Sequence, residues 1–333
     1  MISFNNISKM IQKLSANDEF SGSILVSKNS EIVYSEAYGL SCKSFNIPNK
    51  LNTKHNIASI GKIFTGTAVT QLVQNGLLSF DDAVSNYIDN SFIREEIASK
   101  IKIKHLLTHT SGLGDYFHTA YSKSYRTEIR NLIDYIDLLK DSRLSFTPGS
   151  QWSYSNSGFV LLGFIIENIS KMSFYDYIDR NIFKVCGMIN SSYLCEDEPA
   201  TDKATGYYKV NLCDGNSVYR SNLRKPVIKG SPSGGCYSTV TDLFNYINAL
   251  LNNKLLDEKY TNEVLSPKPE VASPGYGYGF FVDENTFGHS GDGTGVSAIL
   301  QHYKKSGYTV IILSNYSNPS ASNAYDLLCK ELI

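Results

Sequence analysis

The chain has 333 residues, of which 42% are hydrophobic and 19% charged, a balance typical of a folded globular protein that excludes a disordered one. Its 31 basic residues nearly cancel its 32 acidic residues. No net field attracts nucleic acid or an anionic membrane surface, so we expect neither partner. No segment has the ~18 consecutive apolar residues of a membrane span.

The first element that the sequence predicts is an amphipathic helix, because apolar residues recur at helical spacing between Ile2 and Leu14. This segment lacks the continuous apolar run and the cleavage site of a signal peptide. The sequence therefore predicts a cytoplasmic protein, unless it begins after a signal peptide that has been removed. Two β-rich runs follow at residues 23–27 and 31–38, and the polar turn between them predicts a hairpin.

The middle of the chain is predicted to be mainly helical. Apolar residues recur at helical spacing, with polar breaks between the segments, at residues 65–76, 130–140, 157–170, 173–183 and 241–251. Strand-like runs return near the C-terminus, and a last helix follows them. These runs lie at residues 277–291, 296–303 and 307–317, and the last helix at 321–332.

This order predicts an α/β (α+β) fold, in which an antiparallel sheet is built from both chain ends and flanked by helices, with a mainly helical lobe inserted. We expect one catalytic unit, with residues 1–65 and 230–333 in the α/β lobe and 66–229 in the helical lobe. A cleft is expected where the lobes meet. A chain of this size builds a full core, so its scattered cysteines are predicted to be free thiols. They are Cys42, Cys186, Cys195, Cys213, Cys236 and Cys329.

A serine and a lysine stand three residues apart, at Ser59 and Lys62, near the start of a predicted buried helix over residues 57–74. On a helix, side chains at this spacing share a face and can touch. Burial disfavours an ammonium group, so Lys62 either binds acceptors or has a depressed pKa. Either state helps to activate a serine nucleophile, and a helix N-terminus stabilises an oxyanion. The alternative is an ordinary helix with Lys62 extended to solvent.

Tyr154 and Asn156 follow a Pro-Gly turn, at the predicted entrance of another buried helix. A phenol held beside the Lys62 ammonium would lose its proton more readily and could act as a general base. The Asn156 amide offers both a donor and an acceptor, suited to orienting Lys62 and a substrate amide. The alternative for Tyr154 is a packing role among 23 tyrosines.

A glycine-rich segment, His289-Ser290-Gly291 and onward, runs into a strand. Glycines let a ligand approach the main chain, and a strand edge presents N–H and C=O groups to an extended substrate. His289 could contact the substrate or tune the proton affinity of the phenol. The alternative is a tight turn with a hydrogen-bonded histidine.

In order and spacing, these three motifs resemble those of the penicillin-recognising serine hydrolases, in the class C β-lactamase-like branch. That branch includes D-Ala-D-Ala carboxypeptidases, D-aminopeptidases and esterases. The similarity extends from about residue 21 to residue 315 and implies a β-lactamase/transpeptidase-like fold. It implies no cofactor and no metal.

The resemblance also implies roles for individual residues. Ser59 would be the acylated nucleophile, Lys62 its hydrogen-bonded partner, and Tyr154 the group that moves protons to the leaving group. Which of Lys62 and Tyr154 is the effective base stays open, because the two are coupled. Substrate binding would fall to Asn156, His289, Ser290 and Gly291, and the oxyanion hole to the backbone N–H groups of Ser59 and Asp292.

The third motif begins with His289, where efficient β-lactamases carry a lysine. A histidine is mostly neutral at pH 7, so it does not offer the permanent positive charge that attracts a substrate carboxylate. We therefore predict a serine hydrolase for a small ester, amide or peptide, with weak or no β-lactamase activity. The alternative is a penicillin- or peptide-binding sensor module that acylates slowly without efficient turnover. The loops at residues 116–125 and 203–229 would shape the choice of substrate, and the oligomeric state stays open.

Three other interpretations are weaker. Ser290 could be a nucleophile in a G-x-S-x-G elbow, but Asp292 stands where the last glycine belongs. His105 and His109 could bind a metal from one helical face, although no glutamate follows His105 and no third ligand is evident. The glycines at 291, 293 and 295 do not form a dinucleotide fingerprint.

Overall fold

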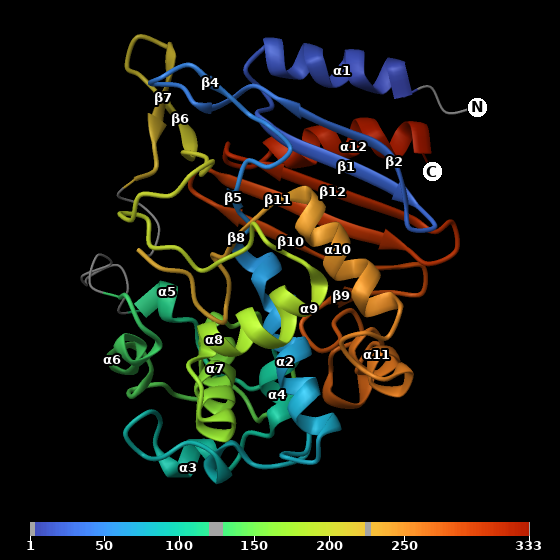
Figure 1. The fold of residues 1–333 in the computed structure, drawn as a ribbon. Coiled ribbons are helices and arrows are strands. Elements are labelled where there is room, and N and C mark those ends of the chain that lie inside the picture. Colours follow the sequence, from blue (N-terminus) through green and yellow to red (C-terminus); the bar gives the residue numbers. More distant parts are fainter. Residues whose placement is uncertain (1–3, 120–128, 224–227, 333) are drawn as a thin grey trace.

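The computed structural model describes residues 4–119, 129–223 and 228–332. Its centre is a six-stranded antiparallel sheet with the strand order β2-β1-β12-β11-β10-β9 (Figure 1). The N-terminal strands lie beside the C-terminal ones, which confirms the sheet built from both chain ends. The strands are β1 (Gly22–Lys28), β2 (Glu31–Tyr38), β9 (Phe281–Val282), β10 (Thr286–Gly293), β11 (Val296–Tyr303) and β12 (Tyr308–Ser314).

Strand β12 joins the two chain ends, because it pairs with β1 on one side and β11 on the other. Its sequence YTVIILS is rich in β-branched residues and is buried along its whole length. Alternate side chains serve two cores. Val310 and Ile312 pack with helices α1 (Phe4–Ala16) and α12 (Ser320–Leu332), whereas Ile311 and Leu313 belong to the larger core on the opposite face.

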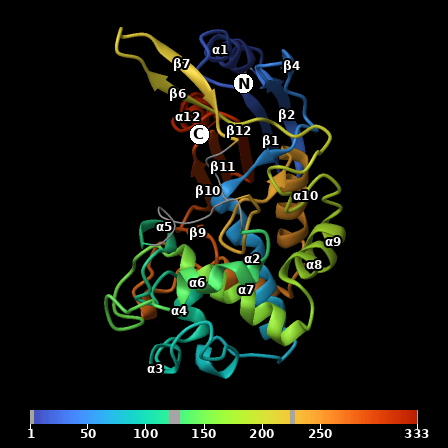
Figure 2. The same ribbon diagram turned by 90° about the vertical axis from the view of Figure 1, so that its left-hand side faces the viewer.

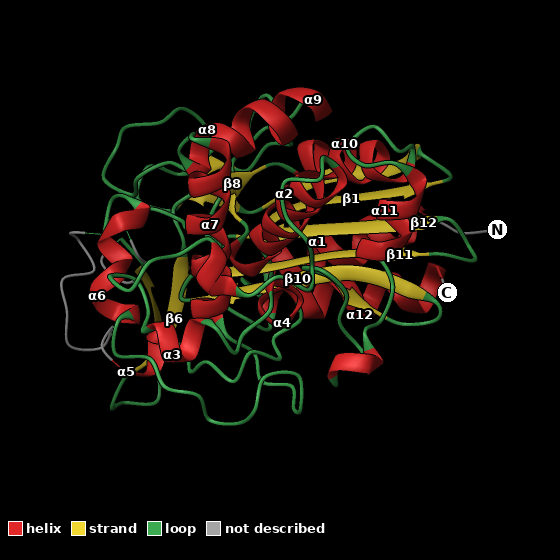
Figure 3. Ribbon diagram, turned by 90° about the horizontal axis from the view of Figure 1, so that it is seen from below, coloured by secondary structure: helices red, strands yellow, loops and turns green. Residues whose placement is uncertain are grey.

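The larger core is shared with the helices between the sheet ends. In the view from below, α2 and α7 lie side by side in the middle of the molecule (Figure 3). Helix α7 begins where Ser155 Oγ accepts a hydrogen bond from the Gly158 N–H at 3.2 Å, which caps the helix. The helices are α2 (Lys62–Gln74), α3 (Glu95–Ala98), α4 (Ile103–Leu107), α5 (Tyr116–Thr119), α6 (Ile136–Leu139), α7 (Asn156–Ser170), α8 (Phe174–Ile178), α9 (Lys184–Cys186), α10 (Val240–Leu251) and α11 (Glu258–Val264).

Short helical turns connect these elements. The turns are η1 (Ala58–Gly61), η2 (Val84–Asn86), η3 (Leu132–Tyr135), η4 (Asp179–Phe183) and η5 (Pro269–Val271). The segment 57–74 is therefore not one helix, because the 3₁₀ turn η1 precedes α2. The cause is local: Ala58 has a φ of +43°, its N–H donates to Asn56 Oδ1 at 2.9 Å, and its carbonyl accepts from the Gly235 N–H at 3.0 Å.

Three small strand pairs lie outside the main sheet and were not predicted from the sequence. They are β3 (Leu40–Cys42) with β4 (Ile47–Pro48), β5 (His55–Asn56) with β8 (Tyr237–Ser238), and β6 (Tyr207–Asn211) with β7 (Ser217–Ser221). The β6–β7 hairpin projects at the end of the molecule that carries α1 and α12 (Figure 2). Tyr219 of β7 connects the hairpin to the loop after α1, because its hydroxyl donates a hydrogen bond to the Asp18 carbonyl at 2.6 Å.

Two simpler predictions can also be compared with the structure. Within the described residues, no helix combines the length and apolar character needed to cross a membrane. All six cysteines are free thiols, as predicted.

Candidate active site

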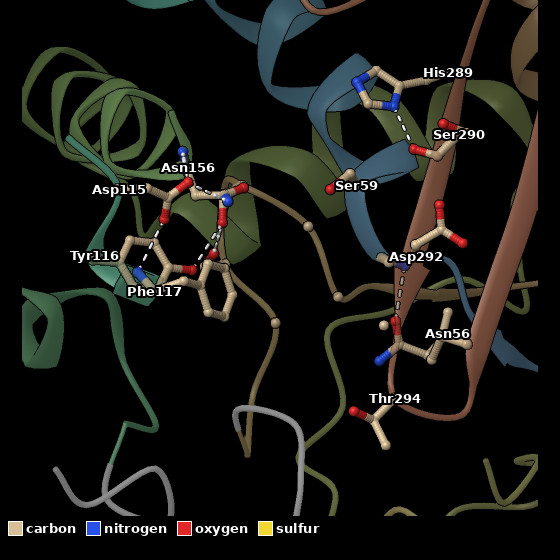
Figure 4. A pocket seen from close by; sticks show the side chains of 18 of the residues that line it. Asn56, Ser59, Asp115, Tyr116, Phe117, Asn156, His289, Ser290, Asp292 and Thr294 are labelled. Atoms are coloured by element: carbon tan, nitrogen blue, oxygen red, sulfur yellow. Dashed lines mark hydrogen bonds between the residues drawn. The ribbon is translucent and has the colours of Figure 1, made fainter. Parts of the chain in front are cut away.

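A cavity of about 710 Å³ opens where β10 meets the helical layer (Figure 4). Segments that are far apart in the sequence form its wall: η1, the residues before α5, the start of α7, the loop around residue 233, and β10. The predicted site residues gather here. Those that line the cavity are Ser59, Tyr154, Asn156, His289, Ser290 and Asp292.

Ser59 lies on η1 and is half-buried at the cavity wall. The backbone of residues 234 and 235 packs directly against this turn. A methyl group at Gly234 would lie 2.4 Å from the Ala58 carbonyl oxygen and 3.0 Å from the Ser59 nitrogen. Only glycine therefore fits opposite the turn, and this close packing fixes the position of Ser59.

Lys62 is fully buried beside Ser59. Its Nζ donates hydrogen bonds to Asn156 Oδ1 at 2.7 Å and to the Ser233 carbonyl oxygen, and lies 3.3 Å from Ser59 Oγ. It also lies over the Tyr154 ring, 4.7 Å from the centroid, where a cation–π contact favours its positive charge. The structure therefore places Lys62 against the serine and away from solvent.

The contacts of Lys62 determine where a neutral amine would direct its lone pair. Burial lowers the pKa of Lys62 from 10.5 to about 7, and the charge of Asp115 opposes this decrease. A neutral amine keeps two N–H donors, and the two stronger acceptors, Asn156 Oδ1 and Ser233 O, occupy them. The lone pair is then directed to Ser59, so Lys62 can accept the hydroxyl proton.

Tyr154 differs from the sequence-based expectation in its acidity. Burial raises the pKa of the Tyr154 phenol far above 10, the charge of Asp115 adds to the increase, and hydrogen bonding with Ser59 opposes it. Lys62 Nζ lies over the face of the ring, and because the pKa of Lys62 is about 7, the amine is neutral before the phenol can ionise. The expectation of a readily ionised phenol is therefore wrong for the free protein. A neutral phenol beside Ser59 is suited to donate a proton.

His289 is directed into the protein. Its Nε2 lies 2.9 Å from the Tyr276 hydroxyl and its Nδ1 lies 2.6 Å from the Ser290 carbonyl oxygen. Because a carbonyl only accepts, Nδ1 carries the hydrogen and Nε2 accepts from Tyr276. Burial and the Lys62 charge lower the pKa of His289 to about 3, so the ring is neutral at neutral pH. Both ring nitrogens are occupied within the protein, which agrees with the alternative of a hydrogen-bonded histidine.

The rest of the third motif lies where β10 passes η1. A methyl group at Gly291 would lie 2.2 Å from the Ile57 carbonyl oxygen, so glycine is required for the strand to approach the turn. Ser290 and Asp292 point to the other side of the strand and line the cavity. Strand β9 pairs only with Phe287 and Gly288 of β10. From His289 onward, β10 is therefore not paired with β9 along this edge.

The weaker interpretations do not gain support. His109 lies beyond the end of α4, with a φ of +61°, so His105 and His109 do not share a helical face. Their Nδ1 atoms accept from the backbone N–H groups of Lys102 and Ser155. In the described ranges, no group of three or more His, Cys, Asp or Glu residues could hold a metal ion. Ser290 lies within β10 and not on a strand-to-helix elbow.

Sequence reasoning missed three parts of this site. Ser233 contacts Lys62 through its backbone carbonyl, which no side-chain pattern reveals. Asp115 contacts Asn156, and His109 lies under Tyr154, with ring centroids 4.2 Å apart. Both belong to the segment "HLLTHTSGLGD", residues 105–115, whose density of small and polar residues in an apolar region was the available signal. The predicted substrate loops lie partly outside the described residues, at positions 120–125 and 224–227.

Comparison with known proteins agrees with the family resemblance of the three motifs, and the match covers nearly the whole chain. The model of the family described as Beta-lactamase matches residues 7–328. The chain belongs to this family. It is 30% identical over 303 residues to the putative penicillin-binding protein PbpX of Bacillus subtilis, and the match covers 90% of this chain and 71% of that protein.

Two solved structures share this fold. The crystal structure of a penicillin-binding protein from Bacillus halodurans has a TM-score of 0.84 and 32% identity, over 96% of this chain and 97% of that one. A D-amino acid amidase from Ochrobactrum anthropi has a TM-score of 0.79 and 20% identity, over 98% of each chain. The β-lactamase fold predicted from the motifs is confirmed.

Proposed function

We propose that this β-lactamase-family protein is a serine hydrolase that acts through an acyl-enzyme intermediate on a small ester, amide or peptide, as D-Ala-D-Ala carboxypeptidases, D-aminopeptidases and esterases do. One observation carries the proposal. Two short hydrogen bonds hold the buried Lys62 amine. The third bonding position of its Nζ atom points to Ser59 Oγ, 3.3 Å away. A base directed at a serine hydroxyl in a cavity is the arrangement that nucleophilic catalysis requires.

The proposed reaction begins when Ser59 Oγ bonds to the acyl carbon while its proton passes to the neutral Lys62 amine. The carbonyl becomes an oxyanion, and the backbone N–H groups of Ser59 and Asp292 are the proposed donors to it. The oxyanion then collapses and expels the leaving group. Tyr154 donates a proton to that group and regains one from the Lys62 ammonium. A water molecule releases the acyl group by the reverse sequence of proton transfers.

The charges around the cavity support a restriction on the substrate. Asp115, Glu196 and Asp292 line it, and no lysine or arginine does so among the described residues. His289 is neutral and turned inward. Among the lining residues that the structure describes, a carboxylate on the substrate would therefore meet like charges and no lysine or arginine. These negative charges favour neutral or cationic substrates and support our proposal of little or no β-lactam hydrolysis.

A slowly acylating sensor is the second candidate, and its support is the 32% identity to a penicillin-binding protein. Intact-mass measurements after incubation with a penicillin, combined with turnover assays on short-chain esters and D-residue peptides, separate the two. We expect rapid turnover of at least one ester or peptide and no lasting penicillin adduct. A penicillin adduct that persists, with no turnover of any ester or peptide, would favour the sensor and overturn the hydrolase.

A further inference from the structure

Asp115 forms part of the cavity wall between Gly114 and helix α5, and it faces the start of α7 (Figure 4). Its Oδ2 accepts hydrogen bonds from both the backbone N–H and the side-chain Nδ2 of Asn156, at 3.0 and 2.8 Å. Its Oδ1 accepts from the Phe117 N–H at 3.0 Å. The carboxylate therefore has three N–H donors, two of which belong to one residue of the proposed active site.

These contacts determine the orientation of the Asn156 amide. A carboxylate only accepts hydrogen bonds, so it selects the NH₂ side of the amide and turns Oδ1 to the opposite side. On that side, Oδ1 accepts from Lys62 Nζ at 2.7 Å. The same amide keeps one N–H for a substrate. Without the carboxylate, the amide could rotate by 180° and present NH₂ to the Lys62 amine.

The negative charge of Asp115 also acts on Lys62. It favours the charged form of Lys62 and opposes the effect of burial. Besides its two acceptors, Asn156 Oδ1 and the Ser233 carbonyl, Lys62 faces five other groups: the Tyr154 and Phe159 rings, the Ser59 hydroxyl and the imidazoles of His109 and His289. Both imidazoles are neutral at neutral pH, because burial and the Lys62 charge lower their pKa values. Asp115 thus supplies the anionic charge that acts on the amine.

We propose that Asp115 is a positioning residue, which holds the Asn156 amide in one orientation and sets the protonation equilibrium of Lys62 through it. The electrostatic part concerns the folded protein alone. The consequence for catalysis rests on the proposed function, since it requires Lys62 to be the base. Two measurements on the same variants separate these parts.

The first measurement is the pKa of Lys62, from the pH dependence of its ¹³Cε resonance in lysine-labelled protein. The resonance is assigned by its loss in Lys62→Met. In Asp115→Asn, and in the smaller Asp115→Ser, we expect the Lys62 pKa to fall by on the order of one pH unit. Glu196→Gln is the matched control, because it removes another negative charge from the cavity wall, where the Glu196 carboxylate binds the Tyr237 hydroxyl. In this control the Lys62 pKa should stay unchanged.

The second measurement is the rate of fluorophosphonate labelling against pH. Its acid limb should move to lower pH in both Asp115 variants, by the same amount as the Lys62 pKa, and should stay in place in Glu196→Gln. An unchanged Lys62 pKa in either folded Asp115 variant, or an equal fall in Glu196→Gln, would overturn the role of Asp115. A lower Lys62 pKa with an unmoved labelling limb would instead leave that role intact and refute Lys62 as the base.

Discussion

Replacing Lys62 by methionine tests the buried amine without any substrate. Burial lowers the pKa of Lys62 from 10.5 to about 7, a difference that corresponds to about 5 kcal/mol. Below pH 7 the folded protein carries this cost in full, because Lys62 is charged in both the folded and the unfolded state. Between about pH 7 and 10 the unfolded state binds more protons than the folded state, so stability rises with pH by about 1.4 kcal/mol per pH unit. Methionine does not titrate.

The assay is equilibrium urea unfolding of the wild type and Lys62→Met at pH 6, 7, 8 and 9. The variant leaves Asn156 Oδ1 and the Ser233 carbonyl without their donor, at a cost of about 1–3 kcal/mol for each acceptor. This cost shifts the difference between the proteins by a constant. We expect the wild type to gain about 2–3 kcal/mol relative to the variant between pH 7 and pH 9, and almost nothing between pH 6 and pH 7.

A stability difference that stays constant from pH 6 to pH 9 would refute this account, because it would show that Lys62 keeps an ordinary pKa in the folded protein. The wild type alone is not sufficient for the test, since other groups also titrate in this range. The difference between the two proteins isolates the contribution of Lys62.

Three further predictions follow from the site. Tyr154→Phe should slow acylation by an amide by on the order of 100-fold, measured as p-nitroaniline release from a D-alanine p-nitroanilide, with circular dichroism as the check on folding; an unchanged rate would exclude the phenol from protonating the leaving group. Gly291→Ala should lower stability by about 1–3 kcal/mol and reduce labelling, because its methyl group meets the Ile57 carbonyl. Gly293→Ala is its control, since a methyl group there meets only Val296, at 3.8 Å, and equal losses in both variants would contradict the packing argument. Among D-alanine p-nitroanilides, the free amine should give a higher kcat/KM than the N-succinyl derivative, most clearly at low ionic strength; a preference for the succinyl compound would show that a cationic group reaches the cavity.

The sequence predicted the main features of the fold because its patterns are local. The β-branched run at 308–314 and the hairpin at 22–38 need only residue preferences and turn chemistry to be recognised. The β6–β7 hairpin was missed, although Asp214-Gly215 between its strands is a turn signal. Its strands are mostly exposed and lack the apolar alternation on which the prediction relied.

The candidate site was predictable where residues are close in sequence and less so where they are not. Ser59 and Lys62 are three apart, and their contact follows from helical geometry even though Ser59 lies on a 3₁₀ turn and Lys62 begins the next helix. The partners of His289 could not be predicted, because Tyr276 comes from a separate loop. Asp115 and Asn156 are 41 residues apart, and only the folded chain shows that they meet.

The most direct test of the central claim is to identify the residue that a fluorophosphonate modifies, by peptide mass mapping of the labelled wild type. We expect the adduct on Ser59, no labelling of Ser59→Ala, and labelling of Ser290→Ala, in which the neighbouring cavity serine is removed. An adduct on Ser290, or undiminished labelling of Ser59→Ala, would contradict the claim that the buried Lys62 amine activates Ser59.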